Sequence, residues 1–252
     1  MKKIFIPLIT AIGKTIEKRR FTRPPVYIGG CGRSGTTLLL SILSAHKNIF
    51  ACPRELNPFE NAYHADHTVT APKFYRIYRT LILQKIKPTA NRYCEKSPAN
   101  VRYIRLMDDF HRGNFRFIHI VRDGRDVILS RHPRGKQDYW VSPERWIRDV
   151  SAGLELENHP SVLTIRYEDL VTRYTETIEN ICHFLDIPVS REILDWHKYT
   201  TVRKNNALHT SIESLNNTSI GKWARPENSK RVAELTGDER AAALLQRLQY
   251  TT

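Results

Sequence analysis

The chain of 252 residues is long enough for one large α/β core and leaves little room for a second full domain. Its formal net charge of +14, from 40 lysines and arginines against 26 aspartates and glutamates, favours polyanionic ligands such as nucleotides, acidic sugars or peptides, nucleic acid or anionic membranes. The four scattered cysteines include no Cys-x-x-Cys pair, which argues against a zinc site and against a disulfide-stapled scaffold. We therefore predict a single domain over residues 1–252, with reduced thiols, in the cytoplasm.

The first 24 residues form a basic and apolar segment, with two lysines before an apolar run from Ile4 to Ile12. The run is too short to span a bilayer and contains Pro7, and no clear small-x-small cleavage site follows it. A secretory signal peptide is therefore the less favoured alternative. We predict an amphipathic helix that packs on the body of the protein or touches a membrane surface, and we expect no transmembrane segment.

Short β-rich runs alternate with longer helical patterns along the rest of the chain, as in right-handed βαβ units with a parallel sheet. The predicted strands are 26–30, 48–52, 91–96, 115–121 and 161–167. The predicted helices are 36–46, 72–86, 100–110, 126–132, 143–158 and 175–187. The pattern predicts an α/β fold in which helices flank a parallel sheet of the P-loop type. Residues 199–221 are polar, and we expect them to form an ordered functional loop or a mobile lid.

The first candidate anion site is GGCGRSGTT, which lies between a predicted strand and a predicted helix. The spacing from Gly30 to Gly35 matches Gly-x-x-x-x-Gly, but Thr36 stands where a nucleoside-triphosphate-binding loop places its lysine. A ligand without a γ-phosphate would not need that lysine. Arg33 could contact a bridging or terminal anionic oxygen, and the hydroxyls at 34, 36 and 37 and the first helix amides add donors. The alternative is an ordinary strand-to-helix turn whose glycines serve packing.

The second candidate anion site is RDGRDVILSRHPR, which follows the predicted strand 115–121. Ligands of open parallel sheets bind beyond the carboxyl ends of the strands. Arg122 and Ser130 could converge there on a second phosphate, with Arg134 further along the same helix face. Taken alone, the segment could be a solvated turn. Together, the two sites suggest a nucleotide with anionic groups in two places.

Six segments in this order resemble the sulfotransferases that use 3′-phosphoadenosine 5′-phosphosulfate (PAPS): GCGRSGTTLLLSILSAHKNI, CPRE, EKSP, HIVRDGRDVILSRHPR, IRYEDL and SIGKW. The arginine-containing loop and EKSP look closest to the tyrosylprotein and bacterial branches. The resemblance implies the sulfotransferase fold and the donor PAPS, with adenosine 3′,5′-bisphosphate (PAP) as product. It implies that the following residues hold the donor: Arg33, Ser34, Gly35, Thr36 and Thr37 at the 5′-phosphosulfate, Arg122, Ser130 and Arg134 at the 3′-phosphate, Tyr167 beside the adenine, and Lys222 and Trp223 in a closing segment.

The chemistry that the resemblance implies is in-line sulfuryl transfer to an acceptor hydroxyl. Arg33 and the helix amides would stabilise the charge of the departing phosphate. Glu55 matches the glutamate that follows the second strand in the tyrosylprotein-like branch, so we predict it as general base; the alternative is an ion pair with Arg54 or another cation. His46 is the rival base. Lys96 and Ser97 could steady the sulfuryl oxygens or the leaving group, or could simply form a strand-end turn.

Other readings of the sequence stay open. A P-loop kinase is one alternative, but the sequence has no lysine at position 36, where such an enzyme needs one. A nucleic-acid-binding protein would account for the positive charge, but the sequence contains none of the common nucleic-acid-binding signatures. His64, Asp66 and His67 could suggest a metal, but we predict none. The acceptor is not specified: the basic excess suggests an acidic glycan or an acid-rich peptide containing tyrosine, while a small phenol or a lipid is also compatible. We expect residues 56–90 and 199–221 to line its cleft.

Overall fold

The computed structural model describes residues 5–60, 71–131, 139–202, 215 and 217–250. Its centre is a five-stranded sheet of order β2-β3-β1-β4-β5 in which every pairing is parallel. The strands are β1 (Val26–Gly29), β2 (Ile49–Ala51), β3 (Arg92–Lys96), β4 (Arg116–Val121) and β5 (Val162–Arg166). The predicted parallel sheet and all five predicted strands are confirmed, with ends that differ by at most one residue.

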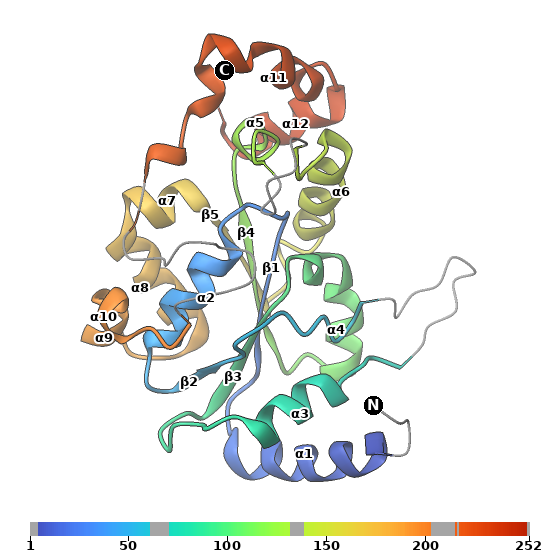
Figure 1. Ribbon diagram of the computed structural model, residues 1–252, viewed down its shortest axis with the longest axis vertical. Coiled ribbons are helices and arrows are strands. Elements are labelled where there is room, and N and C mark those ends of the chain that lie inside the picture. The colour runs from blue at the N-terminus through green and yellow to red at the C-terminus, as the bar shows by residue number, and fades with distance from the viewer. Residues whose placement is uncertain (1–4, 61–70, 132–138, 203–214, 216, 251–252) are drawn as a thin grey trace.

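Helices cover both faces of the sheet (Figure 1). The α-helices are α1 (Ile6–Arg20), α2 (Thr36–Ala45), α3 (Tyr75–Leu83), α4 (Ile104–His111), α5 (Gly124–Val127), α6 (Pro143–Leu154), α7 (Tyr167–Thr172), α8 (Tyr174–Leu185), α9 (Arg191–Leu194), α10 (Trp196–Tyr199), α11 (Ser229–Thr236) and α12 (Glu239–Arg247). Short 3₁₀ turns are η2 (Pro98–Tyr103), η3 (Asn217–Ser219), η4 (Lys222–Ala224) and η5 (Pro226–Asn228). The helices α7, α9, α10, α11 and α12 were not predicted.

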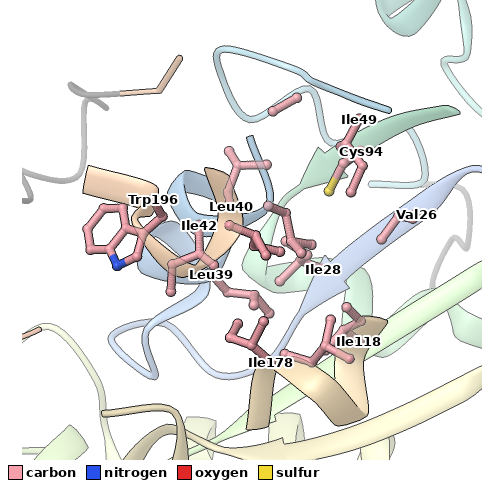
Figure 2. Close-up of a cluster of buried hydrophobic side chains, with 14 of the residues drawn as sticks. Val26, Ile28, Leu39, Leu40, Ile42, Ile49, Cys94, Ile118, Ile178 and Trp196 are labelled. Carbon is pink, nitrogen blue, oxygen red and sulfur yellow. The ribbon is translucent and has the colours of Figure 1, made fainter. Parts of the chain in front are cut away.

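One face of the sheet packs against α2 and the helices that follow β5. Alternate strand residues such as Val26, Ile28 and Ile118 point to this side, where they meet Leu39 and Ile178 (Figure 2). The strands are buried on both sides because a parallel sheet covered by helices has little solvent-facing surface, and β3 carries buried charged residues as well as apolar ones. This packing fixes the first turn of α2 at the carboxyl end of β1.

The opposite face packs against α1, α3 and α4. Tyr27, Tyr93 and Phe117 point to this side and are fully or almost fully buried. Helix α1 lies directly on α3, since a Cβ at Gly13 would come within 2.1 Å of the Tyr78 Cβ. The predicted N-terminal helix is confirmed in the form that packs on the body of the protein.

In the described part of the chain, no helix combines the length and the apolar character that crossing a membrane requires. All four cysteines are free thiols and are buried.

Candidate functional site

The first corner is the turn between β1 and α2. Gly35 precedes α2 with φ of 93°, and a Cβ there would meet the Tyr167 ring at 2.5 Å. Glycine is therefore required at this position both for its backbone conformation and for the close ring contact. Because the first amides of a helix have no intrahelical partner, the start of α2 can bind an anion in the turn.

The predicted donors of this turn lie where an anion could reach them. Ser34 is fully buried, and its hydroxyl has no hydrogen-bond partner among the described residues. Arg33 adopts a positive φ of 72°; burial, and secondarily the charge of Arg122, lowers the pKa of its guanidinium. A buried hydroxyl without a partner among the described residues, beside two neighbouring arginines, fits an anionic group that would accept from the hydroxyl and be attracted by both positive charges.

The second corner is Arg122, the residue after β4. Its Nη1 donates to the Arg33 carbonyl oxygen at 3.1 Å, and its Nη2 donates to the Ser219 carbonyl oxygen at 2.6 Å. Its guanidinium carbon lies 4.5 Å from the centre of the Tyr167 ring. Its buried Nε has no hydrogen-bond partner within the described part of the chain. The two predicted corners and Tyr167 are thus brought together, with Tyr167 as the first residue of α7 and not the last of a strand.

Ser130 does not lie on a helix, contrary to the prediction. Helix α5 ends at Val127, and after two turn residues the chain becomes extended. Arg131 then forms an antiparallel bridge with Tyr139, and the Trp140 amide donates to the Ser130 carbonyl oxygen at 2.9 Å. This pairing competes successfully with helix continuation. Arg134 lies outside the described residues.

The segment around Trp223 is attached to the second corner. The buried Asp126 carboxylate accepts hydrogen bonds from the backbone amides of Gly221 at 2.7 Å and Trp223 at 3.0 Å. The Arg125 guanidinium carbon lies 3.5 Å from the centre of the Trp223 ring, whereas Lys222 is exposed. The closing segment that the sequence predicted therefore lies beside Arg122. Most of the polar loop that precedes it (203–214 and 216) is outside the described residues.

Lys96, at the end of β3, joins the first corner to Glu55. Its side chain is 1% exposed; its Nζ lies 2.6 Å from the Glu55 Oε1 and donates to the Thr37 Oγ1 at 2.9 Å. An ammonium has three N–H donors, so these two contacts leave one for a further acceptor. Glu55 is thus paired with a cation, as the alternative interpretation expected, but with Lys96 and not Arg54. Its carboxylate remains one-third exposed, so an acceptor can still approach it.

Ser97 faces a buried network behind Lys96. Its hydroxyl donates to the Glu95 Oε1 at 2.6 Å and accepts from the Asn57 amide at 3.1 Å. Glu95 also accepts from the Leu56 amide at 2.9 Å and from the Asn100 Nδ2 at 2.7 Å. This geometry favours the strand-end-turn interpretation of Ser97. The network fixes the backbone immediately after Glu55.

His46 lies at the other end of α2 from the first corner. The Asn48 amide donates to its Nδ1 at 3.2 Å, so its Nε2 is the nitrogen that donates to the Pro188 carbonyl oxygen at 3.1 Å. Burial lowers its pKa. These contacts give the rival base a structural role. The described residues contain no group of three or more histidine, cysteine or acidic side chains placed to hold a metal ion, and the segment with His64, Asp66 and His67 is not among them.

Sequence analysis did not predict the contact between Thr37 and Lys96, and it did not single out Glu95, Asp126 or Ser219. The last three stand beside predicted residues in EKSP, RDGRD and SIGKW. These residues lie within the motifs, but each has a hydrogen-bond partner in another part of the chain, so the sequence alone contains no signal for these contacts.

Comparison with known proteins supports the same interpretation. A family model described as a sulfotransferase domain matches residues 23–235. Protein-tyrosine sulfotransferase A of Caenorhabditis elegans is 24% identical over 91% of this chain and 68% of its own length. The protein-tyrosine sulfotransferase of Drosophila melanogaster is 24% identical over 85% of this chain, which spans 48% of that relative.

Solved structures share the fold. The sulfotransferase domain of a Synechococcus olefin synthase superposes with a TM-score of 0.59 at 21% identity, covering 87% of this chain and 96% of that one. A mouse sulfotransferase complexed with PAP gives 0.56 at 15% identity, covering 94% of both chains. Because the family model spans more than half of the sequence, the chain belongs to the sulfotransferase domain family and is related to the tyrosylprotein sulfotransferases.

Proposed function

We propose that this protein transfers a sulfuryl group from PAPS to the hydroxyl of an acceptor, with a peptide tyrosine as the first candidate. The observation that carries the proposal is the pair of adjacent corners, where the buried Ser34 hydroxyl and the Arg122 Nε have no partner among the described residues. Both groups are donors, and both lie near the free amides of α2. The two donors fit a ligand that carries two separate anionic groups, and PAPS is such a ligand.

Each corner has a distinct task in this proposal. When bound, PAPS supplies the sulfuryl group and a phosphate leaving group. Arg33 and the α2 amides stabilise the negative charge that develops in the first corner, which is the largest contribution that such sites usually make. Arg122 holds the second anionic group, and the buried Tyr167 ring, which contacts both Gly35 and Arg122, supports the two corners.

Glu55 and Lys96 act on the acceptor side. Glu55 accepts the proton of the acceptor hydroxyl, and its Oε2 is the candidate for that contact because Oε1 is hydrogen-bonded to Lys96. Lys96 orients Glu55 and places its remaining N–H next to Thr37, at the start of α2. The relatives named protein-tyrosine sulfotransferases favour a phenolic hydroxyl, and the net charge of +14 favours acidic residues around it.

A label-transfer assay tests the proposal. Labelled PAPS would be offered with an acidic tyrosine peptide, the same peptide with phenylalanine, an acidic oligosaccharide and a simple phenol. We expect label on the tyrosine peptide and none on the phenylalanine peptide. Transfer to the oligosaccharide or the phenol alone would show that the acceptor is not a peptide tyrosine but a compound of that other class. Absence of transfer to all four, together with thermal stabilisation by ATP and not by PAP, would refute sulfuryl transfer.

Two variants test the assigned roles. Glu55→Gln should reduce turnover by at least about a hundredfold and leave PAP binding unchanged, whereas Glu60→Gln, on the same loop, should change neither. Arg122→Ala should weaken PAP binding by more than tenfold, since it removes charge-assisted hydrogen bonds of about 1.5–3 kcal/mol. Full turnover in Glu55→Gln would remove it as the base.

A further inference from the structure

Helix α1 carries an apolar stripe on its outer face. Phe5, Leu8 and Ile12 follow helical spacing and are 53%, 57% and 43% exposed. The inner face is fixed on α3 through Gly13 and Tyr78, so the stripe cannot turn inward. Leu83, 63% exposed, ends the helix that runs alongside α1 (Figure 1). A stripe of this kind on a fixed helix marks an interaction surface.

The two segments that form this surface hold most of the net charge of the protein. Residues 5–23 and 71–90 contain ten lysines and arginines and one glutamate, a net charge of +9 out of +14. The exposed members are Lys14, Lys18, Arg19, Arg23, Arg79, Lys85 and Lys87, and among the described side chains only Arg23 of these takes part in an ion pair, with Asp186. The surface is therefore apolar and cationic at once.

The single acidic side chain points away from this surface. Glu17 accepts hydrogen bonds from the Tyr93 hydroxyl at 3.1 Å and the Tyr78 hydroxyl at 3.3 Å, and both tyrosines are buried under α1. Its charge is thus held on the inner side, and the lysines on either side of it, Lys14 and Lys18, remain outside.

A hollow of about 370 Å³ opens beside the end of α1, lined by Ile16, Arg19, Arg20 and Pro88. Arg20 donates through Nη2 to the Ile86 and Lys87 carbonyl oxygens, while its buried Nε has no hydrogen-bond partner among the described residues. Two arginines over an apolar floor match the phosphate and the first carbons of a phospholipid.

We propose that α1 and the end of α3 form a docking surface for an anionic phospholipid membrane. The stripe enters the boundary between headgroups and acyl chains while the flanking lysines and arginines contact the headgroups. A second copy of this chain would bring two cationic surfaces together, and nucleic acid would leave the stripe uncovered. Figure 1 places α1 at the end of the molecule away from α5, so docking leaves both anion corners accessible.

Vesicle flotation of the full chain tests the proposal. We expect co-flotation with vesicles containing about 30% phosphatidylserine, little with pure phosphatidylcholine, and release at high salt. Equal binding to both kinds of vesicle, or binding to neither, would overturn the proposal.

Matched variants locate the surface. Leu8→Asp should weaken vesicle binding at least about tenfold, whereas Val189→Asp, at a similarly exposed site (42%), should not. Lys14→Glu with Lys18→Glu should weaken it about thirtyfold or more, whereas Arg225→Glu with Lys230→Glu should have a much smaller effect. Sulfotransfer to a soluble acceptor and the melting temperature should be unchanged in Leu8→Asp, which separates loss of docking from misfolding.

Other occupants give different results. A dimer in sedimentation velocity that Leu8→Asp dissociates would assign the stripe to self-association and overturn the membrane proposal. Tight binding of duplex DNA that persists in Leu8→Asp, without vesicle binding, would assign the charge to nucleic acid.

Discussion

Replacing Glu95 by alanine should loosen the loop that carries Glu55. The Glu95 carboxylate is fully buried and accepts three hydrogen bonds, from the Leu56 amide, the Ser97 hydroxyl and the Asn100 side chain. All three donors belong to residues that are themselves buried. In Glu95→Ala all three donors lose this carboxylate acceptor, and the Leu56 amide next to Glu55 loses its hydrogen bond to β3.

The expected magnitude follows from the number of donors. A buried donor without a partner costs about 1–3 kcal/mol, so three donors at the lower limit cost about 3 kcal/mol. The lower limit applies because burial raises the pKa of Glu95, which means that removing the carboxylate also relieves an unfavourable burial. For a chain of this size, about 3 kcal/mol corresponds to a melting temperature lower by about 6–12 °C.

Urea unfolding and steady-state turnover measure the two consequences. The exposed Glu179→Ala is the matched control and should change the free energy of unfolding by less than about 0.5 kcal/mol. Turnover of Glu95→Ala should fall while PAP affinity stays within about twofold, because the network contacts the loop after β2 and not the two anion corners. A destabilisation below about 1 kcal/mol with normal turnover would refute the argument.

Three further changes have defined outcomes. Gly35→Ala should weaken PAP binding at least about tenfold by calorimetry, since the position has φ of 93° and an added Cβ would meet the Tyr167 ring at 2.5 Å; unchanged affinity would show that the first corner tolerates the shift. Gly13→Val should cost about 2–3 kcal/mol in urea unfolding because its Cβ would overlap Tyr78, whereas the exposed Ala11→Val should cost less than about 1 kcal/mol, and equal costs would contradict the packing. Burial lowers the pKa of His119 from 6.5 to about 3, so below pH 6.5 the unfolded chain binds a proton that the folded protein excludes. The free energy of unfolding should therefore fall by about 2 kcal/mol as the pH is lowered from 6.5 to 5. His119→Gln should lose this part of the acid sensitivity in urea unfolding, and a pH profile identical to that of the unchanged protein would contradict the argument.

The central sheet was predictable because its strands are buried on both faces and are separated by clear helical patterns. The first strand is four consecutive buried residues, and the loop after it ends in Gly35 at the start of α2. Local sequence determines both features. The helices α11 and α12 were harder to predict because their mean hydropathy is low and their apolar residues become meaningful only against α6, far away in the sequence.

In the candidate site, too, some features follow from the local sequence and others depend on contacts between distant parts of the chain. Arg33 and Arg122 follow predicted strands, so their convergence follows from the parallel order of the sheet. The Glu55 to Lys96 pair and the Asp126 contacts with the segment around Trp223 join residues 41 and about a hundred positions apart. Neither local propensity nor motif spacing contains such pairings. The fate of Ser130 was mispredicted because the chain pairs with Tyr139 and Trp140 instead of continuing α5.

The first and second corners follow β1 and β4, which are neighbouring strands of the sheet. Four residue pairs of β1 and β4 are in register, and hydrogen-bonded strands keep a separation of about 4.8 Å. The strands that lead into the two corners are therefore held at a fixed separation, and the hydrogen bond from Arg122 to the Arg33 carbonyl oxygen joins the corners themselves. The loops after β2 and β3 lie on the other side of β1 from β4, so their sequences can change without altering the separation of the two strands that carry the corners.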